Sequence, residues 1–198
     1  MTPSMGEPTQ KATAERILDA AEALFAKRGY DGTSLADVTD RVGIRGPSLY
    51  NHFKNKRELY TAMLARRLDP FFELLDDLVA TPPSAARSQD SLESMLRHHV
   101  AHPNLARLIQ HAALAEGDQL ELLIERWYRP FFERVGKLFP ELTSVSDAQA
   151  ADAAAVIMGF NNMILGYVTL APLHGRLLDL DPSKERTVES YLLFLTKP

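Results

Sequence analysis

Apolar residues recur with a helical period along almost the whole chain. In the first clear example they fall at Ile17, Leu18, Ala21, Leu24 and Phe25, which is the spacing of one face of a helix. No alternation of apolar and polar residues of useful length marks a strand. The pattern therefore predicts an all-α fold of about nine helices.

Turn and capping residues divide the start of this pattern into three helices. Gly29 is well placed to end the first helix, and Ser34 caps a second one through a capping box with Asp37. Gly43 closes the second helix, and Pro47 suits the first turn of a third. These signals predict one longer and two short helices joined by tight turns.

The rest of the chain predicts longer helices and several breaks. Pro70 lies inside one long apolar pattern and should kink or interrupt that helix. The clearest break is Thr81–Ser84, and a polar cluster at Thr143–Ser146 predicts a loop. The segment Ala171–Asp181 is predicted to be a connection before a last helix that runs to about Leu195.

Residues 153–175 contain no Asp, Glu, Lys or Arg, which meets the crude length criterion for a membrane span. Asn161 and Asn162 stand near the middle of this run and would be costly in lipid, and no basic flank or aromatic belt frames it. A buried helix in the interior or at a subunit interface is the better interpretation. No membrane partner is expected.

The overall charge first argues against a nucleic-acid partner. The 198 residues include 22 Lys plus Arg and 26 Asp plus Glu, so the net charge is −4. Residues 1–57 have nine basic and seven acidic groups (+2), whereas the remainder has 13 and 19 (−6). From Arg41 to Arg57 there are five basic residues and no acid. This window indicates an anion-facing surface, with a solvated helix face as the alternative.

Several function classes lack support in the sequence. The chain has no cysteine, which excludes a disulfide scaffold, a cysteine nucleophile and a thiolate metal site. No nucleophile–base pair or Gly-rich phosphate loop indicates an enzyme, and no cofactor is expected. The first ten residues are polar and unlike a secretory signal, so a cytoplasmic protein is the expectation.

Residues 34–53 have the lengths of a helix-turn-helix, with a glycine in the turn. Small residues at Gly46 and Ser48 let the second helix approach base edges closely, and Arg45 can reach guanine. Side chains such as Tyr50 and Lys56 are suited to phosphate oxygens, which position a protein on DNA without reading its sequence. The predicted DNA-binding residues are Thr33, Ser34, Arg45, Gly46, Pro47, Ser48, Tyr50, Asn51, His52, Lys54 and Lys56.

The stretch from Gly46 to Leu59 closely resembles the DNA-binding signature of the tetracycline-repressor (TetR) family. The matching residues are the pair Leu49-Tyr50, followed by His52, Phe53, Lys56 and Leu59. The resemblance covers about residues 11–62, roughly a quarter of the chain. Two positions depart from the family pattern: Thr39 replaces a small alanine, and Ala36 replaces a base-reading arginine of some members.

The resemblance implies a homodimeric transcriptional regulator, usually a repressor, that binds double-stranded operator DNA. Residues 11–57 would form its helix-turn-helix domain, and residues 58–198 a helical ligand-binding and dimerisation domain. An unidentified small-molecule effector would change the separation of the two recognition helices and so release the DNA. The alternative is a helical protein–protein adaptor without DNA binding, which the acid-free window disfavours.

Effector and dimer contacts are assigned to the second domain. An apolar cavity with a few polar groups is expected from Phe72, Met95, His99, Trp127, Phe131, Met158, Asn162 and Tyr167. A dimer interface is expected from Asn161, Leu165, Val188, Tyr191, Leu192 and Leu195. For both sets the alternative is ordinary core packing within one subunit.

Four of the six histidines lie between His98 and His111. His98 and His102 are four residues apart, which suits a metal on one helix face. However, Pro103 stands where that helix should end, and no nearby carboxylate has an obvious ligand spacing. Surface or pocket-lining histidines are therefore the better interpretation, and no metal site is expected.

Overall fold

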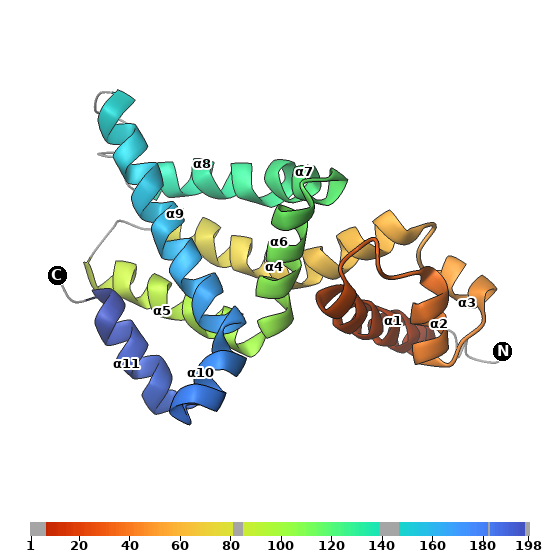
Figure 1. The fold of residues 1–198 in the computed structure, drawn as a ribbon. Coiled ribbons are helices and arrows are strands. Elements are labelled where there is room, and N and C mark those ends of the chain that lie inside the picture. Colours follow the sequence, from red (N-terminus) through yellow and green to blue (C-terminus); the bar gives the residue numbers. More distant parts are fainter. Residues whose placement is uncertain (1–6, 81–84, 139–146, 182, 197–198) are drawn as a thin grey trace.

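The computed structural model describes residues 7–80, 85–138, 147–181 and 183–196, and these residues form helices without strands. Figure 1 shows a small N-terminal part joined to a larger part by one long helix, α4. The N-terminal helices are α1 (Glu7–Arg28), α2 (Leu35–Val42) and α3 (Gly46–Tyr50), followed by α4 (Lys56–Val79). The fold is all-α, as the sequence pattern predicts.

The larger part contains the remaining helices. They are α5 (Ala85–Ala101), α6 (Pro103–Ala115), α7 (Asp118–Leu123), a π-helical segment η1 (Ile124–Tyr128), α8 (Arg129–Leu138), α9 (Asp147–Thr169), α10 (Ala171–Leu178) and α11 (Glu185–Thr196). α7, η1 and α8 follow one another without a break in the chain. Among the described helices, none has the length and apolar character needed to cross a membrane.

The two short N-terminal helices are bounded by the predicted capping residues. The backbone N–H of Asp37 donates to Oγ of Ser34 (3.1 Å), and the N–H of Ser34 donates to Oδ2 of Asp37 (2.8 Å), which completes the capping box. Gly29 and Gly43 have φ values of 73° and 75°, a left-handed conformation that glycine adopts without steric cost. These local predictions are confirmed.

One apolar core joins α1, α2 and α3 to the start of α4. Phe25 of α1, Val38 of α2, Leu49 of α3 and Leu59 of α4 are each fully buried. Tyr60 of α4 packs edge-on against Phe25, with 5.2 Å between the ring centroids. The start of α4 is therefore part of the N-terminal core.

The second half of α4 packs in the larger part, where Leu68 belongs to the core. The helix belongs to both parts, so the domain division after residue 57 stays a prediction. The helix is not interrupted at Pro70, because packing on both sides of the proline holds its flanking turns, whereas a kink at this residue stays a prediction. A second prediction is corrected. α10 is a helix where a connection was predicted, since Pro172 lies in its first turn, where the missing N–H costs nothing. The predicted breaks at 81–84 and 143–146 lie outside the described residues.

Candidate functional site

The exposed surface of α3 presents most of the predicted base-reading residues. Leu49 is fully buried and anchors the helix, whereas Arg45, Pro47 and Asn51 are exposed and Tyr50 is 56% exposed. A Cβ placed on Gly46 would meet no atom within 4 Å, so the space beside this residue is open. The end of α3 can therefore approach a flat partner closely.

Hydrogen bonds fix the turn that sets α3 against α2. The N–H groups of Gly43 and Ile44 both donate to the carbonyl of Thr39, at 2.9 and 3.1 Å. The guanidinium of Arg16 on α1 donates to the carbonyl of Val42 (2.7 Å) and ties the first helix to the end of α2. Thr39 is buried where the family signature has alanine, and its hydroxyl donates to the Ala36 carbonyl (2.9 Å). The extra hydroxyl is therefore satisfied within α2.

Two predicted phosphate-binding residues use their polar groups internally. Thr33 is buried, its hydroxyl donates to the carbonyl of Gly29 (3.0 Å), and its N–H donates to that of Tyr30 (3.2 Å). The N–H of Ser34 donates to Asp37. The Ser34 contact belongs to the predicted capping box, whereas the Thr33 contacts were not predicted, and together they leave neither N–H free for a phosphate.

The basic residues after α3 lie around the N-terminus of α4. Nζ of Lys56 lies 4.1 Å from the centroid of the Tyr30 ring, a cation–π contact that holds this side chain against the core. His52 is half-buried beside Phe53, and Lys54 is exposed. His52, Lys54 and Lys56 directly follow α3 in the sequence and belong to the acid-free window.

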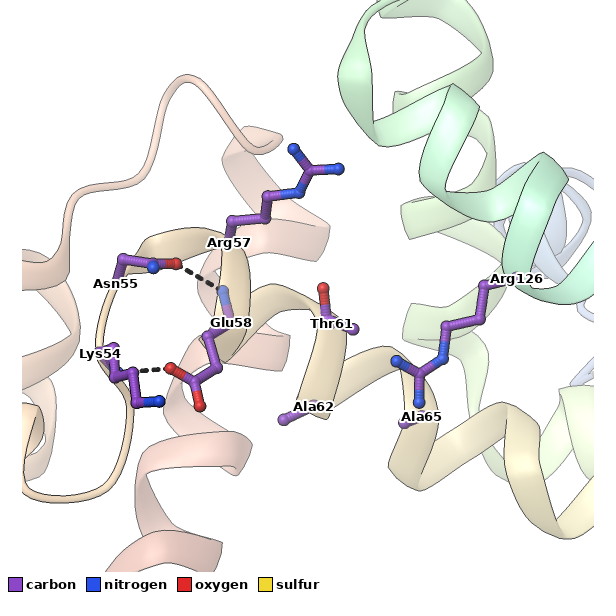
Figure 2. A pocket seen from close by; sticks show the side chains of 8 residues that line it. All are labelled: Lys54, Asn55, Arg57, Glu58, Thr61, Ala62, Ala65 and Arg126. Carbon is purple, nitrogen blue, oxygen red and sulfur yellow. Dashed lines mark hydrogen bonds between the residues drawn. The ribbon is translucent and has the colours of Figure 1, made fainter.

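Figure 2 shows an open groove between the start of α4 and η1. Asn55 accepts a hydrogen bond from the N–H of Glu58 (2.8 Å), and Glu58 accepts one from the N–H of Lys54 (2.7 Å), which fixes this turn. Arg57 and Arg126 also line the groove; in Figure 2, Arg57 points away from this pair of contacts, whereas Arg126 extends from η1 towards Ala65 of α4. The predicted site did not include Arg57, although it belongs to the basic window and is exposed.

A second candidate site is an apolar cavity inside the larger part. It has a volume of about 50 Å³ and is bounded by residues from α4, α5, α6, η1, α8 and α9. The lining residues are Leu68, Phe71, Phe72, Met95, His98, His99, Ile109, Trp127, Tyr128, Phe131 and Asn161. Five residues predicted from the sequence meet here: Phe72, Met95, His99, Trp127 and Phe131.

Three residues predicted for this cavity do not line it. Met158 is 53% exposed and Asn162 is exposed as well, whereas Tyr167 is buried and stacks on Tyr191 at 4.2 Å. Asn161 lines the cavity in place of Asn162, because adjacent residues of a helix point about 100° apart. The sequence shows two neighbouring asparagines but not the rotation of α9 about its axis.

Sequence reasoning also missed several lining residues, of which Phe71, His98 and Tyr128 are polar or aromatic. Phe71 lies three residues after Leu68, and His98 lies three residues after Met95, so helical spacing was the available signal. The indole Nε1 of Trp127 donates to Oδ1 of Asp69 (3.0 Å), which orients the indole ring in the wall.

The cavity histidines are uncharged groups near neutral pH. Burial lowers the pKa of His99 to about 4, and its Nδ1 donates to the carbonyl of Met95 (2.9 Å). Burial also lowers the pKa of His98 and of His102. Within the part of the chain that the structure describes, no group of three His, Cys, Asp or Glu side chains could hold a metal ion.

A charged network joins the N-terminal part to the helices around the cavity. Glu22 on α1 is only 6% exposed and accepts from Arg66 (2.9 Å) and from Arg67 (2.8 Å) on α4. Arg66 also pairs with Glu15 and Asp19, at 3.0 and 2.8 Å. The two arginines directly precede Leu68, so the network lies next to the cavity wall in sequence.

A further contact crosses from α6 to α1. Nε2 of His111 donates to the carbonyl of Ala26 near the end of α1 (3.2 Å). Together with the Glu22 network, this bond connects the N-terminal core to both α4 and α6.

The expected dimer residues that the structure describes pack within one subunit. Leu165 and Val188 are buried within one subunit, which is the core packing given as the alternative, and Asn161 lines the cavity. Tyr191 donates through its hydroxyl to the Met163 carbonyl (2.9 Å). Leu192 packs against the core, and the side chain of Leu195 lies outside the described residues.

Large apolar side chains are nevertheless exposed along α9, α10 and α11. Leu177 is 71% exposed, and the others include Met158, Leu173, Leu178 and Leu193, each more than half exposed. Exposed apolar side chains in this number are typical of a protein–protein contact. The exposed apolar surface of α9–α11 is the better candidate for a subunit interface than the residues chosen from the sequence.

Comparison with known proteins assigns the N-terminal part. Residues 17–63 match the family model described as bacterial regulatory proteins, tetR family. The matched segment covers the second half of α1, all of α2 and α3, and the start of α4, which are the elements that build the helix-turn-helix.

Two curated relatives extend the match. The biofilm operon icaADBC negative transcriptional regulator IcaR of Staphylococcus epidermidis is 27% identical over 150 residues, which cover 58% of this chain and 81% of that protein. The transcriptional repressor KstR2 of Rhodococcus jostii is 35% identical over 98 residues, which cover 48% of this chain and 47% of that protein. The chain thus spans about half the length of the second relative.

The fold as a whole resembles solved regulator structures. A transcriptional regulator from Aquifex aeolicus VF5 has a TM-score of 0.60 at 24% identity, covering 92% of this chain and 99% of the other. Residues 17–63 therefore match the helix-turn-helix segment of the tetR family of bacterial regulatory proteins, and the relatives that the chain resembles are transcriptional regulators.

Proposed function

We propose that this protein is a repressor that binds operator DNA as a homodimer and leaves it when a small molecule enters the apolar cavity. The single observation that carries the proposal is the position of α4. This helix shares the core of the helix-turn-helix through Leu59 and forms the wall of the cavity through Leu68, Phe71 and Phe72.

Operator binding requires two copies of α3 at a fixed distance. Two recognition helices fit successive major grooves when they lie about 34–36 Å apart. The exposed apolar surface of α9–α11 would pair with the same surface of a second copy, which is the usual symmetry of a homodimer. In each subunit, Arg45 would read base edges while Lys54 and Lys56 contact phosphates.

Release follows from the size of the cavity. Its volume of about 50 Å³ is far below the roughly 300–1,000 Å³ that ligand pockets have, so a bound molecule must push the walls apart. Movement of the α4 segment around Phe71 would carry Arg66 and Arg67 with it. Because both arginines bind Glu22, the displacement would reach α1 and change the separation of the two α3 helices.

The test is a mobility-shift titration on the DNA upstream of the chain's own coding sequence. The full chain should bind this DNA as a dimer, and binding should weaken steeply as salt rises. Arg45→Ala should alter base preference, and Lys56→Ala should weaken binding to all sequences alike. Absence of any DNA binding at low salt would overturn the proposal. The alternative of an adaptor that binds no DNA receives no support from the relatives.

A further inference from the structure

The wall of the cavity is suited to an uncharged molecule. None of the described residues that line it is Asp, Glu, Lys or Arg. Burial lowers the pKa of both lining histidines, so His98 and His99 are neutral at pH 7. An ion in this cavity would lose its hydration without gaining a counter-charge, which is a large cost.

Several polar groups of the wall already have partners in the protein. Nδ1 of His99 donates to the carbonyl of Met95, and Nε1 of Trp127 donates to Asp69. The hydroxyl of Tyr128 is hydrogen-bonded to the side chain of Asn161. These contacts orient the wall and do not require a ligand.

His98 differs from these groups, because its Nε2 is buried and has no hydrogen-bond partner. The ring also makes a hydrogen bond to the backbone of Arg67, which raises the pKa of His98 against the larger opposing effect of burial. A backbone hydrogen bond that favours the protonated ring must have the ring as donor. Its acceptor is therefore the carbonyl oxygen of Arg67, since a backbone N–H cannot accept. Since Nε2 has no partner, Nδ1 is the donor of that bond.

The tautomer of His98 follows from this contact. In a neutral imidazole one nitrogen is a donor and the other an acceptor, so Nε2 of His98 is an acceptor without a donor. Buried acceptors without partners are rare in folded proteins and cost free energy that a suitable donor recovers. The ring lies beside Phe71, with 6.3 Å between the centroids, and His98 is one of the residues that line the cavity.

We propose that Nε2 of His98 anchors the ligand of this cavity, and that the ligand is an uncharged, mainly apolar molecule with one hydroxyl or N–H donor. A phenol or an alcohol with a ring-sized apolar body has this chemistry. The aromatic rings of Phe71 and Phe131, 6.1 Å apart, supply the apolar contacts. The inference rests on the proposed function only in treating the bound molecule as the effector.

The probes for this inference are 4-methylphenol and 1,4-dimethylbenzene, which have nearly the same shape and differ by a hydroxyl in place of a methyl group. Their affinities for the full chain are measured by calorimetry. The wild type should bind 4-methylphenol about tenfold more tightly, the gain expected of one buried hydrogen bond. His98→Phe should bring this ratio to about one while 1,4-dimethylbenzene still binds.

Two further variants separate the acceptor from a merely structural role of the ring. His98→Gln retains an acceptor oxygen and should keep part of the preference for 4-methylphenol. His174→Phe is the matched control, because His174 is a half-buried histidine on α10 that does not line the cavity, and it should keep the whole ratio. Melting curves confirm that each variant is folded before its affinities are compared.

Four results would overturn the inference: equal affinities in the wild type, a preference that survives in His98→Phe, tighter binding of 4-methylbenzoate or 4-methylbenzylamine, or no binding of any of these probes. The same preparations are tested for DNA binding without a probe. Loss of DNA binding would overturn the proposed function alone, whereas DNA binding with a failed probe ratio would overturn this inference alone.

Discussion

The two parts of the molecule differ in how strongly short stretches of sequence determine them. In the N-terminal part, each cap or turn residue acts on a backbone group only a few residues away. On α3, Leu49 is buried, and its neighbours Pro47 and Tyr50 are exposed. In the larger part, the cavity collects residues from six helical segments, and its shape depends on how each helix is rotated about its axis. The exposed surface of α3 is therefore determined by residues close together in the sequence, whereas the cavity is determined by tertiary packing.

The largest expected effect comes from the core of the N-terminal part. Leu49→Ala removes a fully buried side chain from α3 and should lower the free energy of unfolding by about 3 kcal/mol. Chemical denaturation measures this value, and a mobility shift should show lost DNA binding. Leu114→Ala is the control, because Leu114 is 85% exposed and its loss should change stability by less than about 0.5 kcal/mol. Equal effects of the two changes would contradict the assigned packing of α3.

An acid-induced loss of stability should come from the cavity. Burial holds the pKa of His99 at about 4 in the folded chain, below its ordinary value of 6.5. As the pH falls, His99 is therefore protonated in the unfolded chain before it is protonated in the folded chain. The contribution of neutral His99 to the free energy of unfolding is complete above pH 6.5 and is lost as the pH falls towards 4. The loss amounts to roughly 3 kcal/mol for a pKa lowered in this way.

Thermal melts at pH 7 and pH 5 measure this effect. His99→Phe should show a smaller decrease in melting temperature than the wild type over this interval. The decrease remains in part, because burial lowers the pKa of His98 and His102 as well. An identical decrease in both proteins would show that His99 is not buried in the neutral form.

The link between the two parts should be weakened at Glu22. Glu22→Gln removes the charge shared by Arg66 and Arg67, and release of DNA should then require about tenfold more 4-methylphenol, within the usual range of coupling energies. The affinity of the cavity for the probe, measured by calorimetry, should stay the same. Asp19→Asn is the matched control, since Asp19 is an exposed partner of the same Arg66. A shift of equal size in both variants would rule out a special role for the buried carboxylate.

A smaller effect is expected at the start of α2. Ser34→Ala removes the side-chain acceptor for the N–H of Asp37 and should cost about 1 kcal/mol of stability. DNA affinity should fall modestly, because α2 supports the turn before α3. Ser48→Ala, on α3 and outside any described cap, should leave stability nearly unchanged. A Ser34 variant as stable as the wild type would contradict the capping box.

These expectations mirror what the sequence could predict. Ser34, Asp37 and Gly43 are recognisable because each acts on a backbone group a few residues away. Pro172 was interpreted as part of a connection, although proline is equally suited to the first turn of α10. Nothing in a single sequence separates these two uses of proline.

Asn161 and Asn162 illustrate the limit for the cavity. Both are polar residues in an apolar helix, and only the packing of α9 against α5 and α6 decides which one lies inside. In the same way, Leu165 and Val188 have the spacing of an interface, but they are buried within one subunit. Apolar periodicity shows that a face is covered without showing whether its own chain or a second copy covers it.

The central claim is that occupation of the cavity changes the separation of the two α3 helices. The chain has no cysteine, so Asp40→Cys on the exposed surface of α2 provides one spin label per subunit. Pulsed electron resonance then measures the label-to-label distance in the dimer with and without 4-methylphenol. The account predicts a shifted distance once calorimetry shows the cavity to be filled, and the same distance in both states would contradict it.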